Sequence, residues 1–153
     1  MAKYDDASWH YEGDFPDDLP ENNGATHIGM LLTWIIENNL YAEEFGEDFS
    51  EEMTEVRSKA LTGTALLLQG CEGKLSDYDL NDEGNEFVSA YYDENSAFSL
   101  EYGSYLQDYT NSMNADARYE TLYHIEDSWD NYAQIKPMID QRFEEWQQFK
   151  KGE

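Results

Sequence analysis

The chain must fold despite a large excess of negative charge. It has 34 Asp and Glu residues against nine Lys and Arg residues, a formal net charge of −25 over 153 residues. Self-repulsion of this size opposes compaction. Apolar residues nevertheless make up 40% of the chain and aromatic residues 15%, which is too many for a disordered protein. We therefore expect a single compact domain over residues 1–153.

The apolar pattern predicts an all-α fold of about five to seven helices. The clearest helix spans residues 25–40, where Thr26 is the N-cap and apolar side chains cover much of the helix circumference. Residues 41–49 are expected to form a linker or short turn. The pattern predicts further helices over residues 50–60, 65–68, 80–92 and 99–113, a less regular region over 119–134, and a terminal helix with Pro137 near its start.

Residues 1–23 are predicted to be an irregular N-terminal segment in front of a helical body, residues 24–150. The segment contains Pro16 and Pro20 and ends in a turn-prone run. It also carries four aromatic residues, and exposing so much ring surface to water is costly. We therefore expect the segment to pack across the helical body.

The sequence predicts a soluble, cytoplasmic protein. The N-terminus is acidic and lacks the apolar stretch of a signal peptide. The longest apolar run, residues 28–36, covers about nine residues, whereas about 20 are needed to span a bilayer. Cys71 is the single cysteine, so no intrachain disulfide is possible. The carboxylate beside it should raise its thiol pKa, which argues against a reactive cysteine.

Motifs that carry chemistry are weak in this sequence. Residues 79–84 resemble the start of a calcium loop, but the twelfth position is Ala90 rather than a bidentate Glu. We interpret them as a turn into a helix with an acidic N-terminus. His10, His27 and His124 lack metal-site spacing, and His27 is expected to hold the N-terminal segment to the helix by hydrogen bonds. No catalytic motif is present, so we predict no enzyme activity, cofactor or metal.

The acids are concentrated in two stretches. Residues 37–55 contain eight acids and no Lys or Arg, and residues 75–130 contain fourteen acids against Arg118 alone. Tyrosines are interleaved with the acids of the second stretch. Such a surface disfavours nucleic acid and anionic membranes and favours a basic protein partner. The predicted partner-binding residues are Asp79, Asp82, Glu83, Glu86, Tyr91, Tyr92, Asp93, Glu94, Glu101, Tyr102, Tyr105 and Asp108.

Three segments carry a family resemblance. The first has the form WH..GDFP..LP followed by THIGM, and it comprises Trp9, His10, Gly13, Asp14, Phe15, Pro16, Leu19, Pro20, Thr26, His27, Ile28, Gly29 and Met30. The weaker two are LNDEGNEFVSAYY at residues 80–92 and the pair Phe143 and Trp146. With these segments the chain resembles an uncharacterised bacterial domain family associated with polymorphic and contact-dependent toxin systems. The resemblance implies an immunity protein.

The leading hypothesis is therefore an immunity protein that binds and neutralises a cognate basic toxin domain. A toxin that acts on nucleic acid must be basic to hold phosphates. Carboxylates would steer the association and tyrosines would anchor the complex, so burial of Tyr91, Tyr92 and Tyr105 would contradict the anchoring role. The alternatives are an acidic DNA mimic that blocks a nucleic-acid-binding enzyme, and an enzyme whose pocket joins a histidine to carboxylates. The oligomeric state stays open.

Overall fold

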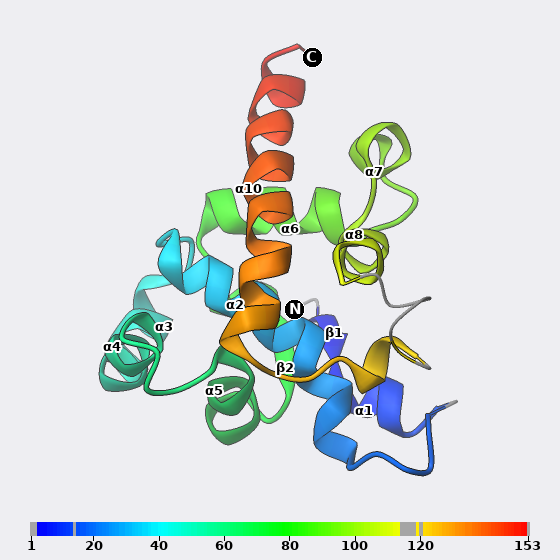
Figure 1. Ribbon diagram of the computed structural model, residues 1–153. Coiled ribbons are helices and arrows are strands. Elements are labelled where there is room, and N and C mark those ends of the chain that lie inside the picture. Colours follow the sequence, from blue (N-terminus) through cyan, green and yellow to red (C-terminus); the bar gives the residue numbers. More distant parts are fainter. Residues whose placement is uncertain (1–2, 14, 114–118, 120, 153) are drawn as a thin grey trace.

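The computed structural model describes residues 3–13, 15–113, 119 and 121–152, and these residues are mostly helical (Figure 1). The all-α prediction is confirmed, with a small two-stranded sheet in addition. The elements in chain order are β1 (Lys3–Asp6), α1 (Ala7–Tyr11), η1 (Glu21–Ala25), α2 (Thr26–Glu37), α3 (Glu43–Asp48), α4 (Ser50–Arg57), α5 (Gly63–Gly70), β2 (Lys74–Ser76), η2 (Asp77–Asp79), α6 (Asp82–Tyr92), α7 (Ala97–Tyr102), α8 (Tyr105–Ser112), η3 (Leu122–His124) and α10 (Trp129–Lys151).

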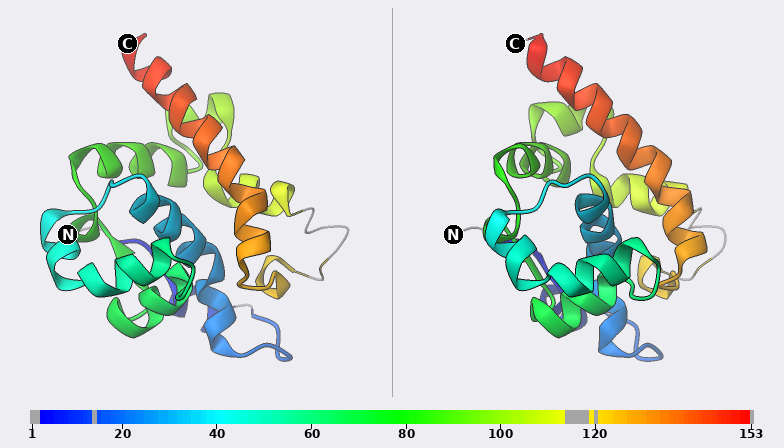
Figure 2. Two further views of the ribbon diagram at one scale, coloured as in Figure 1. Left: turned by 60° about the vertical axis from the view of Figure 1, so that its left-hand side comes forward. Right: turned by 90° about the vertical axis from the view of Figure 1, so that its left-hand side faces the viewer.

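Helix α2 is the centre of the core, as its apolar pattern predicts. All of its residues except the last, Glu37, are buried. Helices α4, α5 and α10 and the η1 turn pack around it (Figures 1 and 2). Helices α2 and α5 approach each other closely because Gly29 of α2 and Gly63 of α5 have no side chains at their contact. The end of α10 projects from the body in each view of Figure 2.

The N-terminal segment is more regular than expected. Strand β1 pairs antiparallel with β2, and α1 follows it directly, with Asp6 as N-cap accepting from the Ser8 N–H. The expected packing across the body is confirmed, since the Tyr4 hydroxyl donates to Asn85 Oδ1 at 2.6 Å. Trp9 is an exception and is 54% exposed.

Four other helix predictions need correction, and the described residues contain more helices than the expected five to seven. The N-cap of α2 is Ala25, and the predicted cap Thr26 is the first residue of the helix. Residues 41–49 include helix α3 rather than a linker. The helix expected over 99–113 is interrupted at Gly103, where a φ of +126° favours glycine, so that α7 and α8 are separate. Pro137 lies inside α10, which starts at Trp129 with Ser128 as N-cap. Pro137 is exposed, so water can compensate for the missing backbone hydrogen bond.

Candidate functional site

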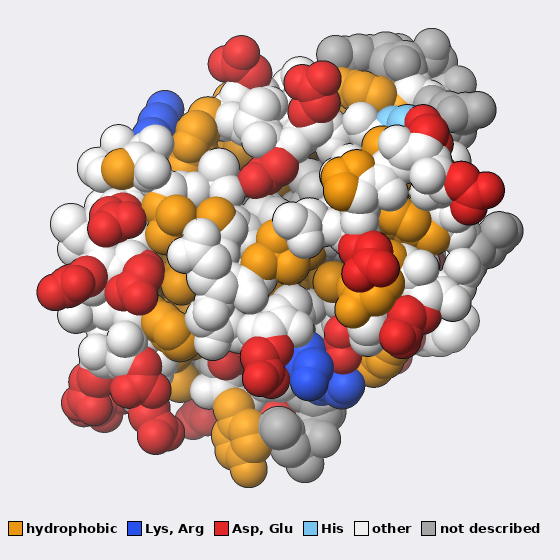
Figure 3. All heavy atoms as spheres, turned by 90° about the horizontal axis from the view of Figure 1, so that it is seen from below, with side chains coloured by type: hydrophobic (Ala, Val, Ile, Leu, Met, Phe, Trp, Pro, Cys, Tyr) orange, Lys and Arg blue, Asp and Glu red, His pale blue; other side chains and the backbone are white. Residues whose placement is uncertain are grey.

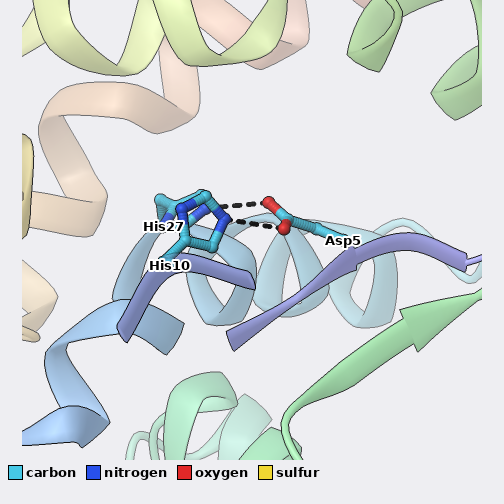
Figure 4. Close-up of side chains that lie close together, drawn as sticks. All are labelled: Asp5, His10 and His27. Atoms are coloured by element: carbon cyan, nitrogen blue, oxygen red, sulfur yellow. Dashed lines mark hydrogen bonds and ion pairs between the residues drawn. The ribbon is translucent and has the colours of Figure 1, made fainter. Parts of the chain in front are cut away.

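A cluster of polar side chains joins the N-terminal segment to the core. Asp5 lies near the end of β1, His10 lies on α1, and His27 lies in the first turn of α2 (Figure 4). The pairing of β1 with β2 fixes Asp5, and the N-cap at Asp6 fixes the direction of α1. The three side chains therefore converge from three elements.

The Asp5 carboxylate is the centre of this cluster and is 3% exposed. Its Oδ1 accepts from His10 Nε2 at 2.7 Å and from the Asp6 backbone N–H at 2.8 Å. Its Oδ2 accepts from His27 Nε2 at 2.9 Å and from the Tyr92 hydroxyl. These four donors match the acceptor capacity of an ionised carboxylate. Because that carboxylate can only accept, both histidines carry a proton on Nε2.

The cluster holds a carboxylate charge inside the fold. Burial alone would raise the pKa of Asp5, but hydrogen bonds from His10, His27 and Tyr92 and the electrostatic interaction with His27 hold that pKa well below its ordinary value. Burial lowers the pKa of His27, and the attraction of Asp5 offsets only part of that effect. Burial also raises the pKa of Tyr92. At neutral pH, Asp5 is therefore ionised, His27 is neutral, and Tyr92 remains a donor.

The second ring nitrogens of the two histidines differ in their surroundings. His10 Nδ1 lies 2.7 Å from the Tyr123 hydroxyl, and Asn23 Nδ2 donates to the Tyr123 carbonyl at 2.9 Å. His27 Nδ1 is buried and has no hydrogen-bond partner among the described residues. The Tyr109 hydroxyl is also buried without such a partner, and its ring centroid lies 6.0 Å from that of His27. His27 therefore retains an unused nitrogen lone pair inside the core.

The first resemblance block lies within a matched region. Residues 3–125 match the family described as a domain of unknown function, DUF7832. The chain belongs to this family. No curated protein and no solved structure matches it. The expectation of an uncharacterised domain family is confirmed, whereas the association with immunity proteins stays a prediction.

In this DUF7832 protein, the predicted role of His27 as a buried tie to the N-terminal segment is confirmed. Sequence reasoning did not find Asp5 or bring His10 to the same place. His10 and His27 are seventeen positions apart, on two elements, so no helical spacing joins them. The available signal was the resemblance block, which contains both histidines.

The structure divides the twelve predicted partner-binding residues of the DUF7832 domain into exposed and buried groups. The exposed ones are all carboxylates: Asp82, Glu83, Glu86, Asp93, Glu94 and Glu101. Asp79, Tyr92 and Tyr102 are half-buried, and Tyr91, Tyr105 and Asp108 are buried.

The predicted anchoring role is wrong for the buried tyrosines. Tyr91 and Tyr105 are 0% exposed, and Tyr91 stacks on Phe87 in the core. The Tyr91 hydroxyl donates to Asp108 Oδ2 at 2.6 Å, and Arg142 binds Asp108 at 2.8 and 3.1 Å. Tyr92 donates to Asp5. These groups stabilise the fold and cannot reach a partner in this conformation.

Two weaker sequence motifs have structural roles. Asp79 Oδ2 accepts from the Ser76 N–H at 2.9 Å, and Asn81 Oδ1 accepts from the Gly84 N–H at 2.8 Å as the N-cap of α6. The interpretation of residues 79–84 as a turn into an acidic helix start is thereby confirmed. Burial raises the pKa of the Cys71 thiol to about 12, and nearby Asp79 adds to the shift, so the direction predicted for this thiol is also confirmed.

Negative charge extends beyond the predicted face. On the underside of the molecule, acidic side chains are spread among apolar and uncharged atoms (Figure 3). Beside the predicted face, an open groove of about 680 Å³ lies along α7 and α8, with Glu94, Leu100, Leu106 and Leu122 in its lining. Leu100 is 74% exposed.

Within the described part of the chain, no helix is both long and apolar enough to cross a membrane.

Proposed function

We propose that this protein is an acidic inhibitor that binds a basic protein partner through the surface formed by α6, α7 and the loop between them. The observation that carries the proposal is the run of exposed carboxylates over residues 82–101. Of these, only Glu86 has a cationic partner among the described residues, Lys150 at 3.2 Å. The others are exposed and form no ion pair with a described Lys or Arg.

The lack of local cations makes this surface suited to electrostatic steering. Residues 75–113 contain nine acids and no Lys or Arg. Arg142 neutralises Asp108 in the interior, so it does not compensate the surface. A basic partner would be attracted over a Debye length of roughly 8 Å at physiological salt. Such steering raises association rates more than it slows dissociation.

An apolar contact is needed to slow dissociation. Because the predicted tyrosines are buried or half-buried, we assign this role to Leu100. It lies at the groove along α7 and α8 between the exposed acids Glu94 and Glu101. An interface commonly has an apolar centre and a polar rim, and Leu100 with its neighbouring acids can form such a centre and rim. We therefore place the anchor of the complex at Leu100 and its groove.

The partner proposed is a cognate toxin domain that acts on nucleic acid. The charge supports this choice, because a protein that holds phosphates presents clustered Lys and Arg. The sequence resemblance to a domain family associated with toxin systems supports it independently of the charge. Under this proposal the domain itself catalyses nothing, and it acts by covering the basic surface of the toxin.

The test compares two variants that remove the same amount of charge from different surfaces. One carries Asp93→Asn, Glu94→Gln and Glu101→Gln, and the control carries Glu43→Gln, Glu44→Gln and Glu47→Gln in α3. The partner is captured from the native host with the unaltered protein, and its association with all three proteins is then measured at low salt. We expect the association rate of the first variant to fall at least about tenfold. The α3 variant should associate nearly as fast as the unaltered protein.

Leu100→Ala should mainly accelerate dissociation, and the complex of the unaltered protein should survive a high-salt wash. Equal slowing by the two charge variants would contradict the proposed surface. Capture of several nucleic-acid-binding proteins, all released by salt and by duplex DNA, would instead identify a DNA mimic. If the unaltered protein retains no partner at all, the inhibitor proposal is refuted.

A further inference from the structure

We propose that Asp5, His10 and His27 bind one divalent transition-metal cation of the zinc class. One ligand atom from each of these residues lies within 4.8 Å of the other two. Two imidazoles and a carboxylate form a donor set typical of zinc and related cations. This inference is independent of the proposed inhibitor function, because it depends on buried side chains and not on the exposed carboxylates of α6 and α7.

The distances require only a small opening of the cluster. Zinc bonds to imidazole nitrogen and carboxylate oxygen are about 2.0–2.2 Å long, which places tetrahedral ligand atoms roughly 3.4 Å apart. The two Nε2 atoms now lie 2.7 and 2.9 Å from the Asp5 oxygens, at hydrogen-bond length. Rotation of His10 can supply the difference, because its side chain is 16% exposed and those of His27 and Asp5 are 1% and 4% exposed. The same exposure gives a cation its route to the site.

The surroundings already contain the outer contacts of a metal site. A ligating histidine normally donates its other ring N–H to a neighbouring acceptor. When a cation replaces the proton on His10 Nε2, that proton moves to Nδ1, which faces the Tyr123 hydroxyl at 2.7 Å. The Tyr92 hydroxyl donates to the Asp5 carboxylate and helps to hold it in place. The ligands are therefore oriented before a cation binds.

His27 is the most buried of the three proposed ligands. Its side chain is 1% exposed, and Nδ1 has no partner among the residues that the structure describes. Binding of the cation at His27 Nε2 moves the ring proton to Nδ1, and the neutral imidazole that results is a preferred ligand for transition metals. The buried carboxylate charge further favours a cation over any neutral group.

The test uses CoCl2 and ZnCl2 with the full chain after treatment with a chelator. Cobalt should bind with a stoichiometry of one and give the visible absorption of a low-coordinate nitrogen and oxygen site, and zinc should displace it. Excess Mg²⁺ or Ca²⁺ should not compete, because these cations prefer oxygen ligands. His10→Gln should weaken cobalt binding at least about tenfold, since even the loss of an outer contact costs about 10–100-fold.

His124→Gln is the matched control. His124 Nε2 also contacts a carboxylate, Asp18 Oδ2 at 3.1 Å, but that carboxylate is 65% exposed. This variant should bind cobalt as the unaltered protein does. If His10→Gln does not fold, zinc titration of the unaltered protein, followed by imidazole ¹⁵N NMR, should shift the His10 and His27 signals and leave those of His124 in place. Absence of the cobalt spectrum, or equal binding by both variants, would show a hydrogen-bonded structural cluster only.

Discussion

Replacing Gly29 by alanine tests the close approach of α2 and α5. A Cβ atom at Gly29 would lie 2.1 Å from Thr64 Oγ1, 2.3 Å from its Cα and 2.5 Å from its backbone nitrogen. The hydroxyl could rotate away, but the backbone atoms of Thr64 could not. Helix α5 would have to move by about 1 Å to restore an ordinary contact, and a packed core resists such a shift.

The expected loss follows from two opposing effects. One extra methylene in a packed core usually lowers the free energy of unfolding by about 1–3 kcal/mol. A clash with backbone atoms should cost more than this, about 4 kcal/mol. Alanine favours the helix over glycine by about 1 kcal/mol. The free energy of unfolding should therefore fall by about 3 kcal/mol. For a chain of this size, Tm should fall by roughly 6–12 °C.

Urea unfolding followed by circular dichroism measures this change. Gly152→Ala is the control, because its added Cβ would lie 3.6 and 3.7 Å from its nearest neighbours, which is ordinary contact. The control should leave the free energy of unfolding nearly unchanged. If Gly29→Ala is as stable as the unaltered protein, α2 and α5 do not pack as closely as described.

The other predictions concern buried ionisable groups. Arg142→Met should lower the free energy of unfolding in urea by about 3–5 kcal/mol, because Asp108 would stay buried without its cation. Lowering the pH from 6.5 towards 5 should destabilise the protein by at most about 1.4 kcal/mol per pH unit, because the lowered pKa of His27 makes the unfolded state bind more protons. His27→Gln should flatten that dependence in pH-dependent urea unfolding. Asp5 titrates below this range, since its folded-state pKa is also lowered, and its contribution should be lost only in stronger acid. The Cys71 thiol, whose pKa is raised to about 12, should react with a disulfide reagent at pH 8 far more slowly in the folded protein than in urea.

The sequence predicted those helices whose apolar spacing or capping residues are visible within a short stretch of chain. Helix α2 was predictable because its apolar residues leave almost no polar face, and all but its last residue are buried. The N-cap of α6 was predictable because Asn81 acts on the backbone three residues later. Helix α3 was missed because its short acidic segment has one buried side chain, Phe45, and its stability comes from packing on neighbours.

The sequence did contain a pattern that indicates the burial of Tyr91, which was predicted to bind a partner. Phe87, Val88 and Tyr91 lie on one face at helical spacing, and that face is the core side of α6. A tyrosine in such a row is expected to be buried, with its hydroxyl bonded to a polar group, which here is Asp108. The cluster around Asp5 had no comparable signal, because its members come from separate elements and meet only in the folded chain.

Buried acids in this protein have hydrogen-bond donors or cations, whereas most exposed acids have no cation to pair with, and this difference bears on function. Each of the buried acids Asp5, Asp6 and Asp108 has several donors or a cation. Nine Lys and Arg residues cannot pair with the remaining acids, so most exposed carboxylates repel one another. Removing three of them from α6–α7 should therefore leave the fold intact or strengthen it at low salt. A loss of partner association in that variant would then report the binding surface itself, and not a loss of folded protein.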